Sequence, residues 1–296
     1  MKTLSILNSL VVAATLLLAA TSCGAPAPRA EDNGPKQLNI SILLDLSDRI
    51  SPTAHPATPS HMQRDTAIIG QITRLFKEDM NERGAYEANG RIQVLMSPPP
   101  SIANINSLQD ELQVSLAKMD NKQKKDTYSD ISGNFATALE EIYTETNNQS
   151  RWTGSDIWRF FKNDVKDLCI ARDTNYRNIL VILTDGYIYD KNTTQRVGSR
   201  VQHLTPTTIG KYRGTNDPIS AMENDDFGLM PATNGLDNLE VLVLEVTPEN
   251  NNQKDELILK YCIDKWLKEM GVSRWAVHTT DLPANTSRRI ETFLNN

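Results

Sequence analysis

This chain has few of the residues that build the common zinc and nucleic-acid sites. Its 296 residues include four histidines and three cysteines, and these form neither a CxxC nor an HExxH motif, which excludes the usual zinc frameworks. Lys and Arg number 31 against 37 Asp and Glu, for a formal charge of −6. The basic residues cluster only at Lys122, Lys124 and Lys125. A surface that follows nucleic-acid phosphates needs clustered Lys and Arg, so we expect no nucleic-acid partner.

Long hydrophobic runs are also lacking. The apolar run over residues 10–20 has about a dozen residues, too few for a permanent membrane-spanning helix. It follows Lys2 and leads through small residues to Cys23. This pattern resembles a bacterial lipoprotein signal, which implies a signal peptide over residues 1–22, lipidation of Cys23 as the only membrane anchor, and a place in the bacterial cell envelope, on the periplasmic side or the cell surface. The alternative is an ordinary export signal cleaved nearby, with Cys23 left over.

The rest of the chain divides into a tether and a folded part. Residues 23–36 are rich in Pro, Gly and small polar residues, which cannot bury a core, so we predict a flexible tether. Hydrophobic residues make up 39% of the chain and charged residues 23%, as in globular proteins. Strands are expected at 38–45, 91–96, 178–186, 239–246 and 274–278, and helices around 67–76, 106–119, 132–146, 154–168, 258–270 and from about 285.

This alternation predicts an α/β fold for residues 37–296, with a doubly wound, mostly parallel central sheet flanked by helices, as in Rossmann-like proteins. Residues 187–236 are long, polar and rich in Gly, Asn, Thr and Pro. Because this stretch shows no apolar periodicity of its own, we expect an insertion rather than a second domain.

Two of the predicted strands end in an aspartate. Asp45 has Ser47 beside it, and Asp185 lies between Thr184 and Gly186. In an open parallel sheet, ligands bind beyond the carboxyl ends of the strands, near the point where the strand order reverses. Carboxylates and hydroxyls that meet there suit Mg²⁺ or Mn²⁺ rather than zinc. Without a cation, two facing carboxylates would repel each other.

Three segments resemble, in order and context, the site loops of a von Willebrand factor type A domain. They are Asp45-Leu46-Ser47-Asp48-Arg49, Gly154-Ser155-Asp156-Ile157 and Thr184-Asp185-Gly186. That family builds a metal-ion-dependent adhesion site from a D-x-S-x-S loop, a threonine before a helix and an aspartate that closes a later strand. The resemblance covers roughly residues 38–296, apart from the insertion. Matched by position, it implies a Mg²⁺ site whose open coordination position takes a carboxylate of a protein partner, with Asp45, Ser47, Ser155 and Asp185 as ligands.

Some positions leave alternatives open. Arg49 replaces the second serine of the first loop: turned inward it would repel a divalent ion or bind a carboxylate in its place, and turned outward it would leave a weaker metal site. Asp156 either modifies the site or serves only as the N-cap of a helix. Residues 129–131 (Ser-Asp-Ile) are a second candidate for the middle loop. We rank them lower because a helical stretch and residues 154–156 separate them from Asp185.

Three functions compete at this point. A binding module that recognises a protein partner through the metal site is favoured, because the sequence offers no convincing nucleophile and so predicts no enzyme. A metal-free scaffold in an envelope complex is supported by Arg49. A Mg²⁺-dependent phosphohydrolase of the haloacid dehalogenase type would need a second carboxylate where Ser47 stands. Whether Cys169 and Cys262 pair stays open, because the sequence does not give their distance.

Overall fold

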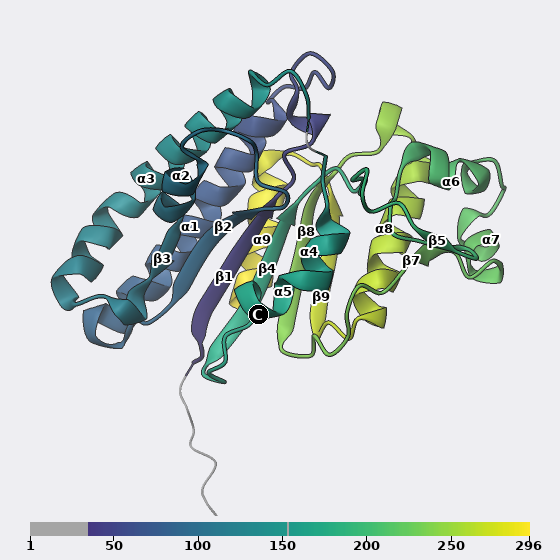
Figure 1. Cartoon of the computed structure of the whole chain (residues 1–296). Coiled ribbons are helices and arrows are strands. Elements are labelled where there is room, and N and C mark those ends of the chain that lie inside the picture. Colours follow the sequence, from purple (N-terminus) through teal and green to yellow (C-terminus); the bar gives the residue numbers. More distant parts are fainter. Residues whose placement is uncertain (1–34, 153) are drawn as a thin grey trace, which may run out of the picture. The chain divides into compact units, whose positions relative to one another are not determined.

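Six strands form the central sheet in the computed structural model, which describes residues 35–152 and 154–296 (Figure 1). In their order across the sheet, the strands are β3 (Gln113–Ser115), β2 (Arg91–Met96), β1 (Gln37–Leu44), β4 (Tyr176–Leu183), β8 (Leu239–Val246) and β9 (Arg274–Thr279). All neighbouring strands are parallel except β2 and β3, which are antiparallel. The α/β prediction with a mostly parallel sheet is therefore confirmed.

Helices cover both faces of this sheet (Figure 1). The core on one face is formed with α1 (His61–Glu87), α2 (Ile105–Glu111), α3 (Asn121–Asn147) and α9 (Pro283–Asn295). The core on the other face is formed with α4 (Ile157–Asn163), α5 (Val165–Cys169) and α8 (Gln253–Glu269). In β4, Ile179 and Val181 face the first core, whereas Leu180 and Ile182 face the second. A strand buried on both faces must be apolar throughout, which explains its continuous hydrophobic run.

The strand order reverses between β1 and β4. The chain leaves β1 through α1 to reach β2 on one side, and β4 later pairs with the other side of β1. Leu44 of β1 is level with Leu183 of β4, which is level with Leu244 of β8. The residues that follow these three strands therefore lie along one edge, at the position where doubly wound folds bind ligands.

Some predicted helices are wrong in their extent. The helix expected over residues 106–119 ends at Glu111, and β3 and a short 3₁₀ helix (η2, Leu116–Lys118) follow. Val114 pairs with Ile92, which turns this segment into an edge strand. The helix expected from 154 divides into α4 and α5 at Asp164. Helix α3 begins earlier than expected, because a capping box between Asp120 and Gln123 fixes its start.

The expected insertion is built into the second core. It contains a small sheet and two helices: β5 (Arg196–Val197), β6 (Arg200–Val201), β7 (Gly228–Leu229), α6 (Pro206–Arg213) and α7 (Pro218–Asn224). Its apolar side chains, Phe227 among them, belong to the same buried cluster as α4 and α8. Residues Pro35–Asn296 make one compact unit.

Cys23, the predicted signal and nearly all of the tether lie outside the described residues. Within the described part of the chain, we find no helix with the length and apolarity needed to cross a bilayer. Cys169 and Cys262 are buried and free, so these two cysteines do not pair.

Candidate functional site

Asp45 is held in one orientation at the end of β1. It is 1% exposed. The backbone N–H of Ser47 donates to its Oδ1 at 2.9 Å, and the Thr184 hydroxyl donates to its Oδ2 at 2.8 Å. A carboxylate oxygen accepts two hydrogen bonds or ligands, so each oxygen keeps one lone pair. The donors come from the first loop and from the end of β4, which ties the two strand ends together.

Asp185 lies one residue beyond Thr184 and is partly buried. Its Oδ1 accepts the backbone N–H of Tyr187 at 2.9 Å. Burial and the negative charge of Asp45 raise the pKa of Asp185 to about 8. Asp45 and Asp185 therefore lie close enough to repel each other, and a cation between them would remove that repulsion.

Ser155 brings an unused hydroxyl to the same edge. It is 3% exposed, and its Oγ has no hydrogen-bond partner among the described residues. Its backbone pairs with Tyr189, N–H to carbonyl in both directions, at 2.9 and 3.1 Å. Gly154 makes this pairing possible, since its φ is +83° and a Cβ would lie 2.6 Å from the Tyr189 carbonyl oxygen.

The start of α4 and the end of β4 lie side by side. Ile157, Thr184 and Gly186 line the same small cavity behind the strand ends. Ser155 precedes this start of α4 by two residues. A buried hydroxyl without a hydrogen-bond partner is costly, so a hydroxyl of this kind at the strand-end edge is a candidate ligand group.

Asp156 has a structural role. It is fully buried and caps α4, with its Oδ1 accepting the Arg159 N–H at 3.0 Å. Its Oδ2 accepts the Thr193 hydroxyl at 2.8 Å, which fastens the insertion to this helix. Its Oδ2 also lies 3.3 Å from Arg159 Nε, so the cap, the insertion and an ion pair all use this carboxylate. The lower-ranked candidate, Ser129, lies exposed in the middle of α3, with its hydroxyl donating to the Lys125 carbonyl.

Arg49 is turned inward, into the space between the sheet and α1. It is 1% exposed and belongs to the 3₁₀ helix η1 (Asp48–Ile50). Its Nε donates to the Asp45 carbonyl at 2.9 Å, and its Nη2 donates to the Leu183 carbonyl at 3.1 Å and to Asp65 Oδ2 at 2.6 Å. The guanidinium thus joins the backbones of β1 and β4 immediately below the candidate site.

The charge of Arg49 is matched by a buried acid. Asp65 of α1 is 0% exposed and also accepts the Tyr143 hydroxyl at 3.0 Å. Burial opposes the positive charge of Arg49, but the carboxylates of Asp65 and Asp45 outweigh it and raise the pKa of the guanidinium. Arg49 Nε still lies 3.9 Å from Asp45 Oδ2. The site therefore has a fixed positive charge beside one of its carboxylates.

The sequence analysis missed a third acid at this edge. Glu245 directly follows Leu244 of β8, is 2% exposed and has φ of +69°. Its Oε2 accepts Arg64 Nε at 2.5 Å. A signal for it existed, because the apolar run of β8 reaches a carboxylate as those of β1 and β4 do. The strand continues through this residue to Val246, as expected, but the pairing of β8 with β9 shifts its register between Val243 and Val246.

The donor set that the resemblance implies fits a hard cation in its chemistry. It consists of two carboxylates and two hydroxyls, which suit Mg²⁺ or Mn²⁺. The unpartnered Ser155 hydroxyl and the free lone pairs of Asp45 agree with that use. No group of three or more His, Cys, Asp or Glu positioned for a metal occurs in residues 35–152 and 154–296. A site with two carboxylates and two serines falls below that number.

Comparisons with known proteins do not assign a family. No family model and no curated protein matches the chain. A solved structure with some likeness is the pilus adhesin SpaC from Lactobacillus rhamnosus GG, at 8% identity and a TM-score of 0.39. The match covers 88% of this chain but only 30% of that one.

Proposed function

We propose that this chain is a lipid-anchored binding module of the bacterial cell envelope, which recognises a protein partner through a divalent-cation site at the ends of β1 and β4. The observation that carries this proposal is the buried Ser155 hydroxyl, which has no hydrogen-bond partner within residues 35–152 and 154–296. It lies on a segment paired with the loop that follows Asp185. Asp45 and Asp185 add two mutually repelling carboxylates at the point where the strand order reverses.

Asp45, Ser47, Ser155 and Asp185 would hold Mg²⁺ or Mn²⁺. When bound, the ion offers an open coordination position to a carboxylate of the partner. Thr184 and the Ser47 N–H orient Asp45. We propose no enzymatic reaction, because none of these residues pairs with a base as an activated nucleophile would.

A metal-free scaffold is the second candidate. The observation in its favour is Arg49, whose guanidinium already lies 3.9 Å from the Asp45 carboxylate. A positive charge fixed there reduces the gain from a second cation. The two functions differ in whether the chain binds metal at all.

A calorimetric titration of Mg²⁺ and Mn²⁺ into the full chain, purified in a mild detergent, separates them. Binding should stabilise the fold by about 1 kcal/mol at a fivefold excess over Kd. Asp185→Ala should abolish both the heat and the rise in Tm. Asp126→Ala, which removes an exposed carboxylate of α3, should leave both unchanged. If the chain shows neither heat nor a Tm shift at millimolar ion, the scaffold is the better proposal.

The anchor is tested by metabolic labelling of cells with an alkyne fatty acid. We expect label on the chain and none on Cys23→Ser. Cys169 and Cys262 are internal controls, because they are buried and their burial raises the pKa of each thiol to about 12. An unlabelled wild-type chain would point to an ordinary export signal instead.

A further inference from the structure

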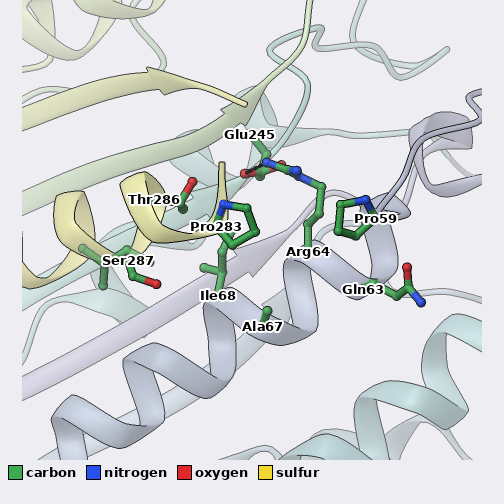
Figure 2. Close-up of a pocket in the computed structure, with 10 residues that line it drawn as sticks. Pro59, Gln63, Arg64, Ala67, Ile68, Glu245, Pro283, Thr286 and Ser287 are labelled. Atoms are coloured by element: carbon green, nitrogen blue, oxygen red, sulfur yellow. Dashed lines mark hydrogen bonds and ion pairs between the residues drawn. The ribbon is translucent and has the colours of Figure 1, made fainter. Parts of the chain in front are cut away.

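A pocket opens between α1 and α9 at the end of β8 (Figure 2). Its apolar walls include Pro59 and Ile68 on the side of α1, and Pro283 and Ile290 from α9. None of these residues belongs to the proposed cation site. The cavity measures about 70 Å³. Since a cavity of about 150 Å³ holds benzene, this pocket, which is open to solvent on one side, encloses only part of a molecule of six heavy atoms.

One end of the pocket is polar and charged. Figure 2 shows Arg64 and Glu245 extending toward each other. Arg64 Nε donates to Glu245 Oε2 at 2.5 Å, and Arg64 Nη2 donates to Glu245 Oε1 at 3.3 Å and to the Asp281 carbonyl at 2.5 Å. Glu245 also accepts the Thr280 hydroxyl at 3.3 Å. The ion pair is therefore complete, and the pocket presents no net charge.

A second polar group in the pocket has no partner. Thr286 of α9 lines the cavity and is 4% exposed, and its hydroxyl makes no hydrogen bond to any described residue. Such a buried group is usually satisfied by water or by a ligand. Arg64 Nη1 also forms no hydrogen bond within residues 35–152 and 154–296, while its other two nitrogens do, but unlike the Thr286 hydroxyl it is not fully buried. Two donors thus remain available beside the apolar walls.

We propose that this pocket binds a small neutral molecule with a short branched aliphatic body and one carbonyl oxygen, such as a primary amide. The aliphatic body would pack on the two prolines and two isoleucines, and the carbonyl would accept from Thr286 and Arg64. An ionised carboxylate of the same shape is disfavoured, because Glu245 already balances Arg64 and the added charge would be buried without a counter-ion. The backbone of Glu245, with φ of +69°, is strained, as is common at ligand sites.

Isobutyramide and isobutyrate test this choice, since they have the same size and differ in charge. Each is titrated into the full chain in detergent, and the δ1-methyl signals of Ile68 and Ile290 are followed by NMR. We expect saturable shifts at these two methyls with isobutyramide, and at least about tenfold weaker binding of isobutyrate. Ile209, which lies in α6 away from the pocket, should not move.

Two variants locate the binding. Thr286→Val keeps the shape of the side chain but removes its hydroxyl. It should weaken the binding of isobutyramide by about two- to tenfold, which corresponds to the loss of one hydrogen bond. Ala67→Leu fills the pocket from an exposed position of α1 and should abolish binding without disturbing the fold. The proposal is overturned if the shifts are non-saturating, if the two probes bind equally, or if Ala67→Leu still binds. It does not depend on the cation site, so Asp185→Ala should bind isobutyramide normally.

Discussion

The buried pair of Arg49 and Asp65 decides how much positive charge reaches the candidate site. Arg49 lies 2.6 Å from Asp65 and 3.9 Å from Asp45, so its charge is directed mainly at the acid of α1. In the proposed function, Asp65 does not bind the cation itself. It pairs with Arg49 and so leaves the Asp45 carboxylate available to the cation. A neutral residue in place of Asp65 would turn the whole charge of Arg49 toward Asp45.

Asp65→Asn should therefore weaken Mg²⁺ binding and lower the free energy of unfolding by roughly 3–5 kcal/mol, as when one partner of a buried ion pair is lost. Isothermal titration and urea unfolding measure the two effects. Tyr143→Phe is the matched control, because it removes a hydrogen bond to the same carboxylate and keeps both charges. It should cost about 1.5–3 kcal/mol and leave the Mg²⁺ affinity unchanged. Equal Mg²⁺ affinities of Asp65→Asn and wild type would contradict the role given to Asp65.

Asp185 makes the stability of the metal-free chain depend on pH. Burial and Asp45 raise its pKa from 3.8 to about 8, so between these values the folded state holds a proton that the unfolded state has lost. Stability should then fall as the pH rises toward 8. Asp185→Asn removes this loss, so in EDTA its Tm should exceed that of wild type at about pH 9 and match it below about pH 4.

Thermal unfolding at the two pH values checks this prediction. Saturating Mg²⁺ should close the gap at high pH, because a cation replaces the proton. His61, whose pKa burial lowers to about 4, contributes its own pH dependence, but both chains share it and it cancels in the difference. A constant Tm difference across the range would show that Asp185 is not the group responsible.

Some residues of the candidate site can be predicted from the sequence, and others cannot. Asp45 and Asp185 were found because parallel strands end at one edge, so two local patterns are enough to place both. Asp65 was missed because its role arises from a contact that no local pattern encodes. The apolar run that reaches Glu245 was a local signal for its position, but its pairing with Arg64 was not predictable. Asp65 meets Arg49 across the packing of α1 on the sheet, and Glu245 meets Arg64 from 181 positions away.

Helix α4 shows how one capping residue fastens an element to its surroundings. Asp156 accepts the N–H of Arg159, in the first turn of the helix, and the hydroxyl of Thr193 in the insertion. Asp164 stands at the corresponding place before α5 but makes no capping hydrogen bond. The two aspartates, eight residues apart, thus form a natural comparison.

Asp156→Ala should lower the free energy of unfolding by about 1–2 kcal/mol or more, since it removes a cap and leaves Thr193 unpaired. Asp164→Ala should change it by less than about 0.5 kcal/mol. Urea unfolding of both variants gives the comparison. The folded Asp156→Ala protein should bind Mg²⁺ with the affinity of the wild type. A selective loss of metal binding would make Asp156 a member of the site instead of a cap.

Elements were predictable where one pattern persisted over many residues. The central strands were found because burial on both faces demands continuous apolar runs. β3 is three residues long, and its identity comes from pairing with β2, so the local sequence reads equally well as the end of a helix. β5, β6 and β7 have two residues each, too few for any periodicity to show.

At the scale of the whole described unit, the polar insertion and the sheet share one core. Phe227 of the insertion is 1% exposed and its ring centroid lies 4.6 Å from that of Tyr212. The indole N–H groups of Trp158 in α4 and Trp266 in α8 both donate to the Met230 carbonyl, at 2.8 and 2.9 Å. Helices on the second face thus converge on the insertion, which therefore cannot unfold alone without exposing their apolar faces.

Phe227→Ala should consequently destabilise the whole unit by about 3–5 kcal/mol, the cost of removing a buried aromatic ring. Far-UV circular dichroism and tryptophan fluorescence should report the same urea midpoint, lowered in the variant, because sheet and insertion unfold together. Val197 of the insertion is 67% exposed. Val197→Ala should therefore change the free energy of unfolding from either signal by no more than about 0.5 kcal/mol. If the fluorescence of Phe227→Ala changes well before its circular dichroism, the insertion unfolds as a separate body and the shared core does not couple it to the sheet.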